Sequence, residues 1–314
     1  MTDSHGIRYR RGGRFVLSVK RGALQRKETI AGLLFVSPML IGVGVMVLLP
    51  ILATLYLSFT EWSLITGFEG IKWVGLDNFD KLFNDAKFIK SLKNNLIFLL
   101  TVPAYLAISL ALAVIINKFV YAKDFFKVIY FLPYVSSIVA VATVWRVLFH
   151  PSLGPVNQFL MAVGMDNPPK WIADPQFALV SLMMISVWTS IGFNMIVYLA
   201  GLQSIPKDLY EAADIDGANG WIRFTRITLP MLSPTTFFLL ITGIIYTFKA
   251  FELIAVMTQG GPAGSTSVIV WHLYETAFVN LKVGYASSMA MILFLCVLAI
   301  TFVQWIGQKK WVNY

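Results

Sequence analysis

Charged side chains are scarce in this sequence. Asp, Glu, Lys and Arg make up 13% of the 314 residues, whereas hydrophobic residues make up 57%. Soluble globular proteins carry about 25% charged residues, and a chain with so few charges cannot cover a solvated surface. The mean hydropathy of +0.72 agrees with this. The composition therefore excludes a soluble enzyme, a disordered chain and a disulfide scaffold, and it predicts an integral membrane protein.

Cysteine and histidine are also rare. Cys296 is the single cysteine, so it closes no intramolecular disulfide. The histidines, His5, His150 and His272, show no metal-ligand spacing, and we expect no metal site. No glycine is followed directly by lysine, so the sequence lacks the phosphate-cradling P-loop. We therefore expect a non-catalytic chain that binds no cofactor of its own.

Long uncharged runs are abundant. A membrane helix needs about 20 mostly apolar residues, and six uncharged windows satisfy this condition. Window 253–274 is equally long, but its middle, Thr258-Gln259-Gly260-Gly261-Pro262, cannot stay helical in lipid, and we predict a loop there. The predicted fold class is an all-α membrane protein with six transmembrane helices. We expect them at about residues 30–59, 94–117, 128–145, 175–203, 227–248 and 283–308.

Basic residues gather on one side of these predicted helices. Segments 1–28, 118–127, 204–226 and 309–314 hold 16 Lys and Arg residues, and the segments on the other side hold 9. Because Lys and Arg are enriched in cytoplasmic loops, we expect both termini in the cytoplasm. Residues 1–28 are then a basic cytoplasmic tail, and residues 29–314 form one membrane domain. The net charge of +9 reflects this orientation, and we expect no nucleic-acid partner.

The cytoplasmic segment 204–226 is patterned rather than a simple connector. Pro206 suits the first turn of a helix, Asp216-Gly217 is a turn signal, and Asn219 can cap a second short helix. We therefore predict two short helices joined by a turn. An amphipathic hairpin lying at the membrane surface is the plainer interpretation of the same pattern.

The same segment resembles a known motif. Glu211-Ala212-Ala213, three residues, Gly217, nine residues, Ile227, one residue and Leu229-Pro230 match the EAA loop of ABC-importer permeases at every fixed position. Further segments resemble the sugar-permease branch, the maltose and glycerol-3-phosphate type, and the resemblance extends over residues 28–310. These segments are Gly75-Leu76-Asp77-Asn78-Phe79, Phe131-Leu132-Pro133, Gly201-Leu202-Gln203-Ser204-Ile205-Pro206 and Thr258-Gln259-Gly260-Gly261-Pro262.

The resemblance implies a coupling role for the EAA loop. In that family the loop is a helix that docks on an ATPase subunit, which carries ATP and Mg. The implied contact residues are Glu211, Ala212, Ala213, Asp216 and Gly217, whereas Ile227, Leu229 and Pro230 would pack the second helix and start the next span. The implied partners are a second homologous permease, two ATPase subunits and an extracytoplasmic solute-binding protein, in a bacterial cytoplasmic (inner) membrane.

Polar and aromatic side chains within the predicted spans are candidates for a substrate path, because such groups usually face the protein interior or a cavity. Ordinary helix packing is the alternative. The candidates are Tyr134, Trp188, Thr189, Ser190, Phe193, Asn194, Tyr246, Thr247 and Phe251. Aromatic faces with hydroxyl and amide groups suit a sugar, and the second to sixth spans lack internal Lys and Arg, which favours a neutral sugar or oligosaccharide. Glycerol-3-phosphate or another organic solute is the alternative substrate, and an ATP-independent carrier or membrane scaffold is the alternative class.

Overall fold

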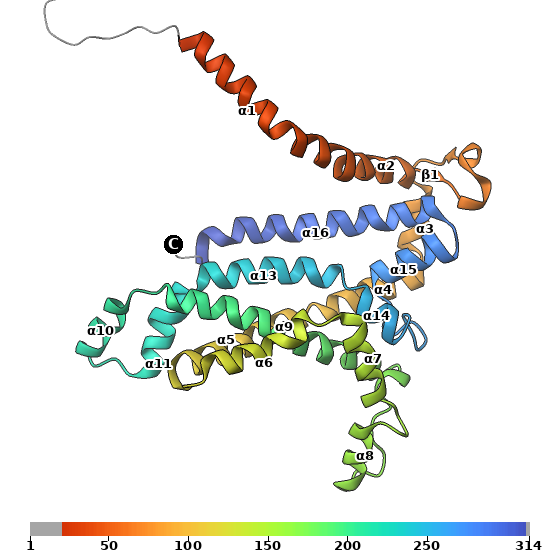
Figure 1. Cartoon of the computed structure of the whole chain (residues 1–314). Coiled ribbons are helices and arrows are strands. Elements are labelled where there is room, and N and C mark those ends of the chain that lie inside the picture. Colours follow the sequence, from red (N-terminus) through yellow and green to blue (C-terminus); the bar gives the residue numbers. More distant parts are fainter. Residues whose placement is uncertain (1–20, 312–314) are drawn as a thin grey trace, which may run out of the picture. The chain divides into compact units, whose positions relative to one another are not determined.

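The computed structural model describes residues 21–311 and consists almost entirely of helices (Figure 1). It divides into two units, Met1–Ala53 and Thr54–Tyr314. The first unit contains α1 (Arg21–Val43), a π-helical turn (Gly44–Leu48) and the start of α2 (Leu49–Ser58). Residues 1–20 of the predicted tail lie outside the described part, and residues 21–28 belong to α1.

In the second unit, α5 and α9 pack against each other more extensively than any other two elements do, and α6 and α13 also pack on α9. The core between them and α13 contains Leu106, Met195, Leu199 and Leu239, all buried. A Cβ at Gly192 would overlap the carbonyl of Tyr130, so glycine lets α9 and α6 approach backbone to backbone. The unbroken helices of this unit include α3 (Asp77–Phe83), α4 (Ala86–Phe98), α5 (Thr101–Phe119), α8 (Pro155–Ala162), α9 (Ala178–Gln203) and α16 (Val283–Trp311).

Four helical stretches of the described residues are long and apolar enough to cross a membrane. They are Glu28–Ser58, Ala86–Lys118, Ala178–Gln203 and Val283–Gln308. Two further stretches satisfy the same test only as bent helix pairs, which raises the number to six if each pair is one span. The described residues therefore form a multi-pass membrane fold, and the predicted spans at 128–145 and 227–248 each fall within one of the bent pairs.

The first bent pair joins α6 (Lys123–Val135) to α7 (Ile138–Leu148) at an angle of 94°. Pro133 has no N–H and removes one helical hydrogen bond. Ser136 then adopts an extended backbone with ψ of 148°, and its hydroxyl donates to the carbonyl of Leu132 over 2.8 Å. The backbone N–H of Ser136 donates to the same carbonyl over 3.1 Å, so α6 ends here with this carbonyl bonded twice.

The second bent pair joins Gly220–Met231 to α13 (Ser233–Phe248) at 60°. Pro234 cannot donate to the carbonyl of Pro230, and the hydroxyl of Ser233 donates to it instead over 2.6 Å. The long apolar helix therefore begins at Ser233, after the segment that contains α11 (Gly220–Arg223), a π-helical turn (Phe224–Thr228) and α12 (Leu229–Met231).

The segment 253–274 is more helical than the sequence suggested. α14 (Glu252–Met257) and α15 (Ile269–Tyr274) flank its middle, and a π-helical turn (Glu275–Val279) follows. Buried apolar side chains such as Ile254 and Ile269 give both short helices a face to pack. The glycines and proline break the helix between them, so the predicted loop is present in the middle of the segment and does not extend to its two ends.

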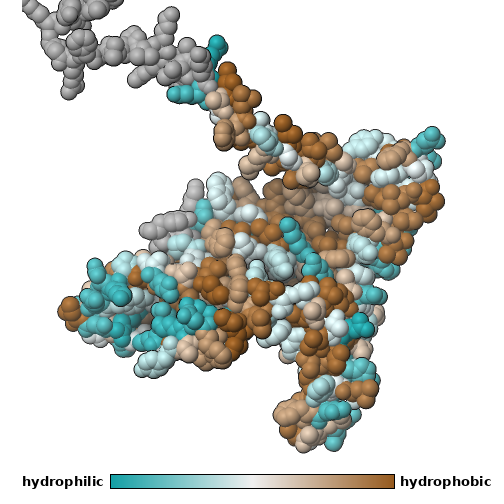
Figure 2. Space-filling model, viewed as in Figure 1, coloured by the Kyte–Doolittle hydropathy of each residue, from teal (hydrophilic) through white to brown (hydrophobic). Residues whose placement is uncertain are grey.

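Different elements lie at the two ends of the second unit (Figure 1). One end carries α10 (Lys207–Ile215) and α11, where hydrophilic side chains gather in Figure 2. We call the opposite end the distal end. It carries α3, α8, α15 and the antiparallel strand pair β1 (Thr60–Glu61) and β2 (Lys72–Trp73), in which Thr60 lies opposite Trp73.

Candidate coupling hairpin and substrate pocket

Residues 207–228 form two short helices joined by a tight turn, as predicted, and we call them the coupling hairpin. Gly217 occupies the turn with φ of +73°, a left-handed conformation that residues with a side chain rarely adopt. A Cβ at this position would meet no atom within 4 Å, so the backbone conformation, and not crowding, requires glycine. Asn219 caps α11 by accepting the N–H of Ile222 over 2.9 Å, which confirms the predicted cap.

Side-chain contacts tie the hairpin together and to the helices behind it. Arg223 of α11 pairs with Asp214 of α10. The hydroxyls of Tyr210 and Thr228 lie 2.9 Å apart, which joins α10 to the π-helical turn. Ile227 packs against the core of α5, α9 and α13. These contacts connect α10 to the residues that precede α13.

The predicted contact residues lie on the free surface of the hairpin. Glu211, Ala212, Asp216 and Gly217 are exposed, and Ala213 is half-buried. Of the predicted packing residues, Ile227 and Pro230 are half-buried, whereas Leu229 is exposed. The sequence analysis missed Ile215 and Trp221, which are 87% and 72% exposed. Large apolar residues within a charged loop are a signal that could have identified them.

A cavity of about 200 Å³ lies between α5, α6, α9 and α13, and we call it the inner pocket. Five predicted path residues line it: Tyr134, Ser190, Phe193, Asn194 and Tyr246. The rings of Tyr134 and Phe193 stack with centroids 4.9 Å apart at 19°. The side-chain amide of Asn194 donates to the carbonyl of Ser190 over 2.7 Å. The pocket thus combines an aromatic wall with amide and hydroxyl groups.

Three residues of the inner pocket were missed by the sequence analysis: Tyr105, Thr242 and Gly243. A Cβ at Gly243 would overlap the hydroxyl of Tyr105, so this glycine makes room for the tyrosine. Gly243 lies three residues before Tyr246, and this spacing on one helix face could have identified it.

The other predicted path residues lie elsewhere. Trp188 packs edge to face on Trp145, with centroids 5.6 Å apart. Thr189 and Thr247 donate their hydroxyls to carbonyls of their own helices. Phe251 follows the end of α13 and stacks on Trp271 at the distal end. These four positions do not line the inner pocket.

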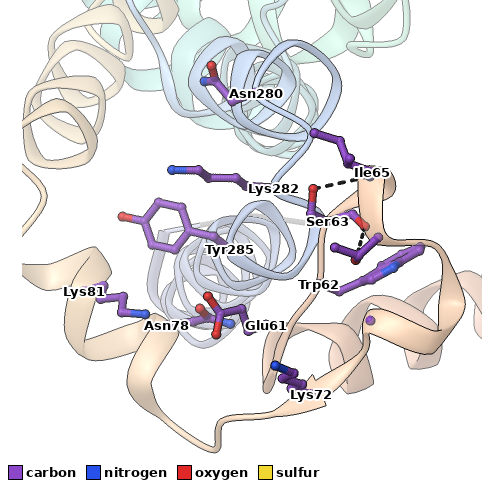
Figure 3. A pocket seen from close by; sticks show the side chains of 12 residues that line it. Glu61, Trp62, Ser63, Ile65, Lys72, Asn78, Lys81, Asn280, Lys282 and Tyr285 are labelled. Carbon is purple, nitrogen blue, oxygen red and sulfur yellow. Dashed lines mark hydrogen bonds between the residues drawn. The ribbon is translucent and has the colours of Figure 1, made fainter.

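The distal end carries its own polar sites. A cavity of about 710 Å³ beside the β1–β2 pair is lined by Lys72, Lys81 and Lys282 together with Glu61 (Figure 3). The first residue of α15 is held by α4, because the side-chain oxygen of Asn95 accepts the N–H of Ile269 over 2.9 Å.

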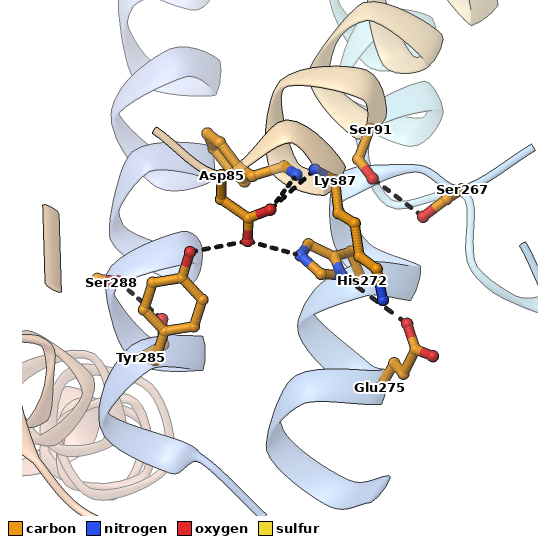
Figure 4. A network of polar contacts seen from close by, with 9 residues as sticks. Asp85, Lys87, Ser91, Ser267, His272, Glu275, Tyr285 and Ser288 are labelled. Atoms are coloured by element: carbon orange, nitrogen blue, oxygen red, sulfur yellow. Dashed lines mark hydrogen bonds and ion pairs between the residues drawn. The ribbon is translucent and has the colours of Figure 1, made fainter. Parts of the chain in front are cut away.

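Asp85 is the centre of a polar network at the same end (Figure 4). Its carboxylate accepts the hydroxyl of Tyr285 over 2.9 Å and the N–H of Lys87 over 2.8 Å, which caps α4. His272 Nε2 lies 3.6 Å from the same carboxylate, and its Nδ1 lies 3.8 Å from Glu275. Burial acts to raise the pKa of Asp85, but these hydrogen bonds hold it below its usual value. Among the described residues, no group of His, Cys, Asp and Glu could hold a metal ion.

A membrane fold of bent and straight spans, with an exposed helical hairpin at one end and a pocket between the helices, is that of a transport permease. The chain belongs to the family described as binding-protein-dependent transport system inner membrane component, whose model matches residues 105–312. It is 37% identical over 302 residues to the probable ABC transporter permease protein YesP of Bacillus subtilis (strain 168). That match covers 95% of this chain and 96% of YesP.

Two further relatives carry substrate names. The lactose transport system permease protein LacF of Rhizobium radiobacter is 36% identical, over 93% of this chain and 99% of LacF. The sn-glycerol-3-phosphate permease UgpA of Agrobacterium fabrum (strain C58 / ATCC 33970) is 36% identical, over 77% of this chain and 83% of UgpA.

A chain of a bacterial ABC transporter that imports the acidic polysaccharide alginate has the same fold. The TM-score is 0.80 at 26% identity, and the match covers 93% of this chain and 99% of that chain. A second structure of the alginate transporter, in complex with a periplasmic protein that holds alginate pentasaccharide, gives a TM-score of 0.79. It covers 92% of this chain and 97% of that one at 26% identity.

Proposed function

We propose that this ABC-importer permease carries a neutral sugar or oligosaccharide into the cytoplasm by alternating access. The inner pocket is the observation that carries the proposal. Aromatic rings accept the C–H faces of sugars, and Ser190, Asn194 and Thr242 offer hydrogen-bonding groups to sugar hydroxyls. None of the described residues that line the pocket is charged, which favours a neutral sugar over glycerol-3-phosphate.

The coupling hairpin supports ATP-driven transport. Glu211, Ala212, Ala213, Asp216 and Gly217 are proposed as its contact with an ATPase subunit. The exposed surface at Glu211 and Ala212, and the fastening of the hairpin to α13, suit the transfer of a displacement from an ATPase to the helices around the pocket. ATP and Mg then belong to the ATPase, and this chain binds no cofactor.

We infer the rest of the assembly from the family and the exposed surface. Tyr246 lines the inner pocket and is 72% exposed in this chain, so a second permease would close the pocket. Two ATPase subunits would bind at the hairpin end, and an extracytoplasmic solute-binding protein would bind at the distal end. In this arrangement both termini of the six-span permease lie in the cytoplasm.

The experiment is sugar uptake into proteoliposomes that contain the complete importer. Replacing Tyr134 or Asn194 by alanine should raise the KM for the sugar about tenfold, because each change removes roughly 1.4 kcal/mol of contact. Thr189→Ala is the matched control, since Thr189 lies on the same helix as Asn194 and does not line the pocket. Equal KM values in all variants would show that the inner pocket does not bind the sugar. Ion-gradient-driven uptake by the isolated chain would favour an ATP-independent carrier.

A further inference from the structure

A second cavity, of about 250 Å³, lies at the distal end between α4, the segment 259–267 and α15. Pockets that hold drug-sized ligands measure about 300–1,000 Å³, so this one suits a single ring. Its walls carry an indole, an ammonium, a carboxylate and an amide. The residues that supply these groups are Trp271, Lys87, Glu275 and Gln259.

The walls of this cavity are fixed by α4. Lys90 Nζ donates to the carbonyl of Ala263 over 2.7 Å. The side-chain amide of Asn94 donates to the carbonyls of Gly264 and Ser267 over 3.1 and 2.8 Å. A ligand would therefore meet a segment that is already held in place, which lowers the entropy cost of binding.

The backbone of this segment is also unusual. Gln259 and Ala263 adopt φ angles of +50° and +49°, although neither is glycine. Such conformations are costly, and they concentrate at binding sites, where the surrounding structure maintains them. Both residues line the cavity.

Trp271 is positioned by a glycine. A Cβ at Gly260, whose φ is +76°, would overlap the indole nitrogen, so only glycine lets the ring lie against the segment. The indole also contacts two aromatic rings, those of Phe251, stacked with centroids 5.8 Å apart at 25°, and Tyr274, with centroids 5.7 Å apart. Phe251 comes five residues after Tyr246 of the inner pocket.

The polar groups of the cavity carry both signs of charge, because Lys87 and Lys90 are cationic and Glu275 is anionic. Lys87 and Glu275 reach the same side of His272 in Figure 4, and Lys90 already donates to a carbonyl. A free anion would meet the carboxylate of Glu275, whereas a neutral hydroxylated ring can donate to Glu275 and accept from Lys87 while one face lies on Trp271.

We propose that this distal cavity is an outer subsite for one pyranose ring of the transported sugar, occupied before the ring reaches the inner pocket. Trp271 provides the stacking face, Lys87, Glu275 and Gln259 bind hydroxyls, and Gly260 positions Trp271. The proposal rests on the proposed sugar-import function, and it adds a binding site that the inner pocket does not include.

The test is saturation-transfer NMR on the importer complex in nanodiscs, with lactose and the methyl glycosides of glucose, galactose and mannose as probes. The complex carries Tyr134→Ala and Asn194→Ala to weaken the inner pocket, and only the part of the signal that depends on Trp271 is assigned to the subsite. We expect ring protons of at least one probe to receive saturation. Trp271→Ala should weaken this binding about tenfold, because it removes about one stacking contact and the area that the contact buries. Trp271→Phe should restore most of the binding.

Controls separate the subsite from loss of folding. Lys87→Ala should weaken the signal, whereas Lys93→Ala should leave it unchanged, because Lys93 is exposed on the same helix and does not line the cavity. Gly260→Ala should act like Trp271→Ala, because a Cβ at this position displaces the indole.

Three results would overturn the proposal: no signal from any probe, a signal that survives Trp271→Ala, or Lys87 variants that impair only docking of the binding protein. The last result would assign these groups to a protein contact. ATP-driven uptake by a complex with an intact inner pocket, measured in parallel, shows whether the import function stands when the subsite fails.

Discussion

The coupling hairpin and the inner pocket differ in how their residues are brought together. The hairpin takes its shape from about twenty consecutive residues that include a cap, a left-handed glycine and the ion pair of Asp214 with Arg223. The pocket is assembled from four helices that are far apart in the chain. Local geometry leaves a fixed spacing in a sequence, whereas a cavity between helices leaves only scattered polar and aromatic residues.

The largest expected effect concerns the hairpin turn. Gly217→Asp places a side chain at φ of +73° and a charge on the proposed ATPase contact, so it should abolish ATP-driven uptake while membrane insertion stays normal. Proteoliposome uptake and ATPase activity measure the effect. Gly220→Asp is the matched control, because Gly220 begins α11 with an ordinary φ and open space around it. Unchanged uptake in the Gly217→Asp variant would show that the left-handed turn is not required for ATP-driven transport.

A change in the inner pocket should have a smaller effect, and it offers a rescue. Gly243→Ala forces a methyl group against the hydroxyl of Tyr105 and should cost about 1–3 kcal/mol in packing or sugar binding. The variant should show a raised KM for sugar uptake. Adding Tyr105→Phe removes the overlapping oxygen and should recover much of the loss. A double variant no better than Gly243→Ala would mean that the contact between the two residues does not shape the pocket.

The cap of α11 is the next test. Asn219→Ala removes the acceptor for the N–H of Ile222 and should destabilise the hairpin by about 1 kcal/mol. Because further contacts also hold the hairpin, the loss of coupling should be partial. More ATP should be hydrolysed for each sugar molecule taken up than in the original chain. Asn219→Ser, which keeps a capping oxygen, should behave like the original chain, and a serine variant as impaired as the alanine variant would argue against capping.

The smallest expected effect is the pH dependence at Asp85. Because its pKa is lowered by folding, its contribution is present above the ordinary value of 3.8 and is lost as pH falls through the lowered value. Thermal unfolding of the detergent-solubilised importer should therefore show a small acid destabilisation that Asp85→Asn reduces. An identical acid response in the asparagine variant would assign the effect to other carboxylates.

The sequence predicted what depends on neighbouring residues. The apolar windows located four of the spans as continuous helices, and the motif located the hairpin with its turn at Gly217 and its cap at Asn219. The sequence did not predict the two bends. The serines at the bends, Ser136 and Ser233, donate their hydroxyls to carbonyls at helix ends. In a hydropathy profile these serines look like ordinary membrane residues.

The inner pocket shows more clearly what could not be predicted from the sequence. Tyr134, Phe193 and Asn194 were identified as polar or aromatic residues in apolar runs, but the same criterion selected Trp188 and Thr247, which do not line the pocket. It could not find Gly243, whose role is to leave space for a residue on another helix. Which polar residue faces a cavity depends on helix rotation and crossing, and these are set by the whole core.

The central claim is that the coupling hairpin docks an ATPase to this permease. The most direct measurement is a pull-down of the tagged chain from membranes in mild detergent, with the co-purifying proteins identified by mass spectrometry. We predict recovery of an ATPase subunit and a second permease, with the ATPase lost and the second permease retained when Glu211 and Gly217 are replaced. A chain that is recovered alone under conditions that preserve a control importer, or an ATPase that stays bound to the double variant, would contradict the account.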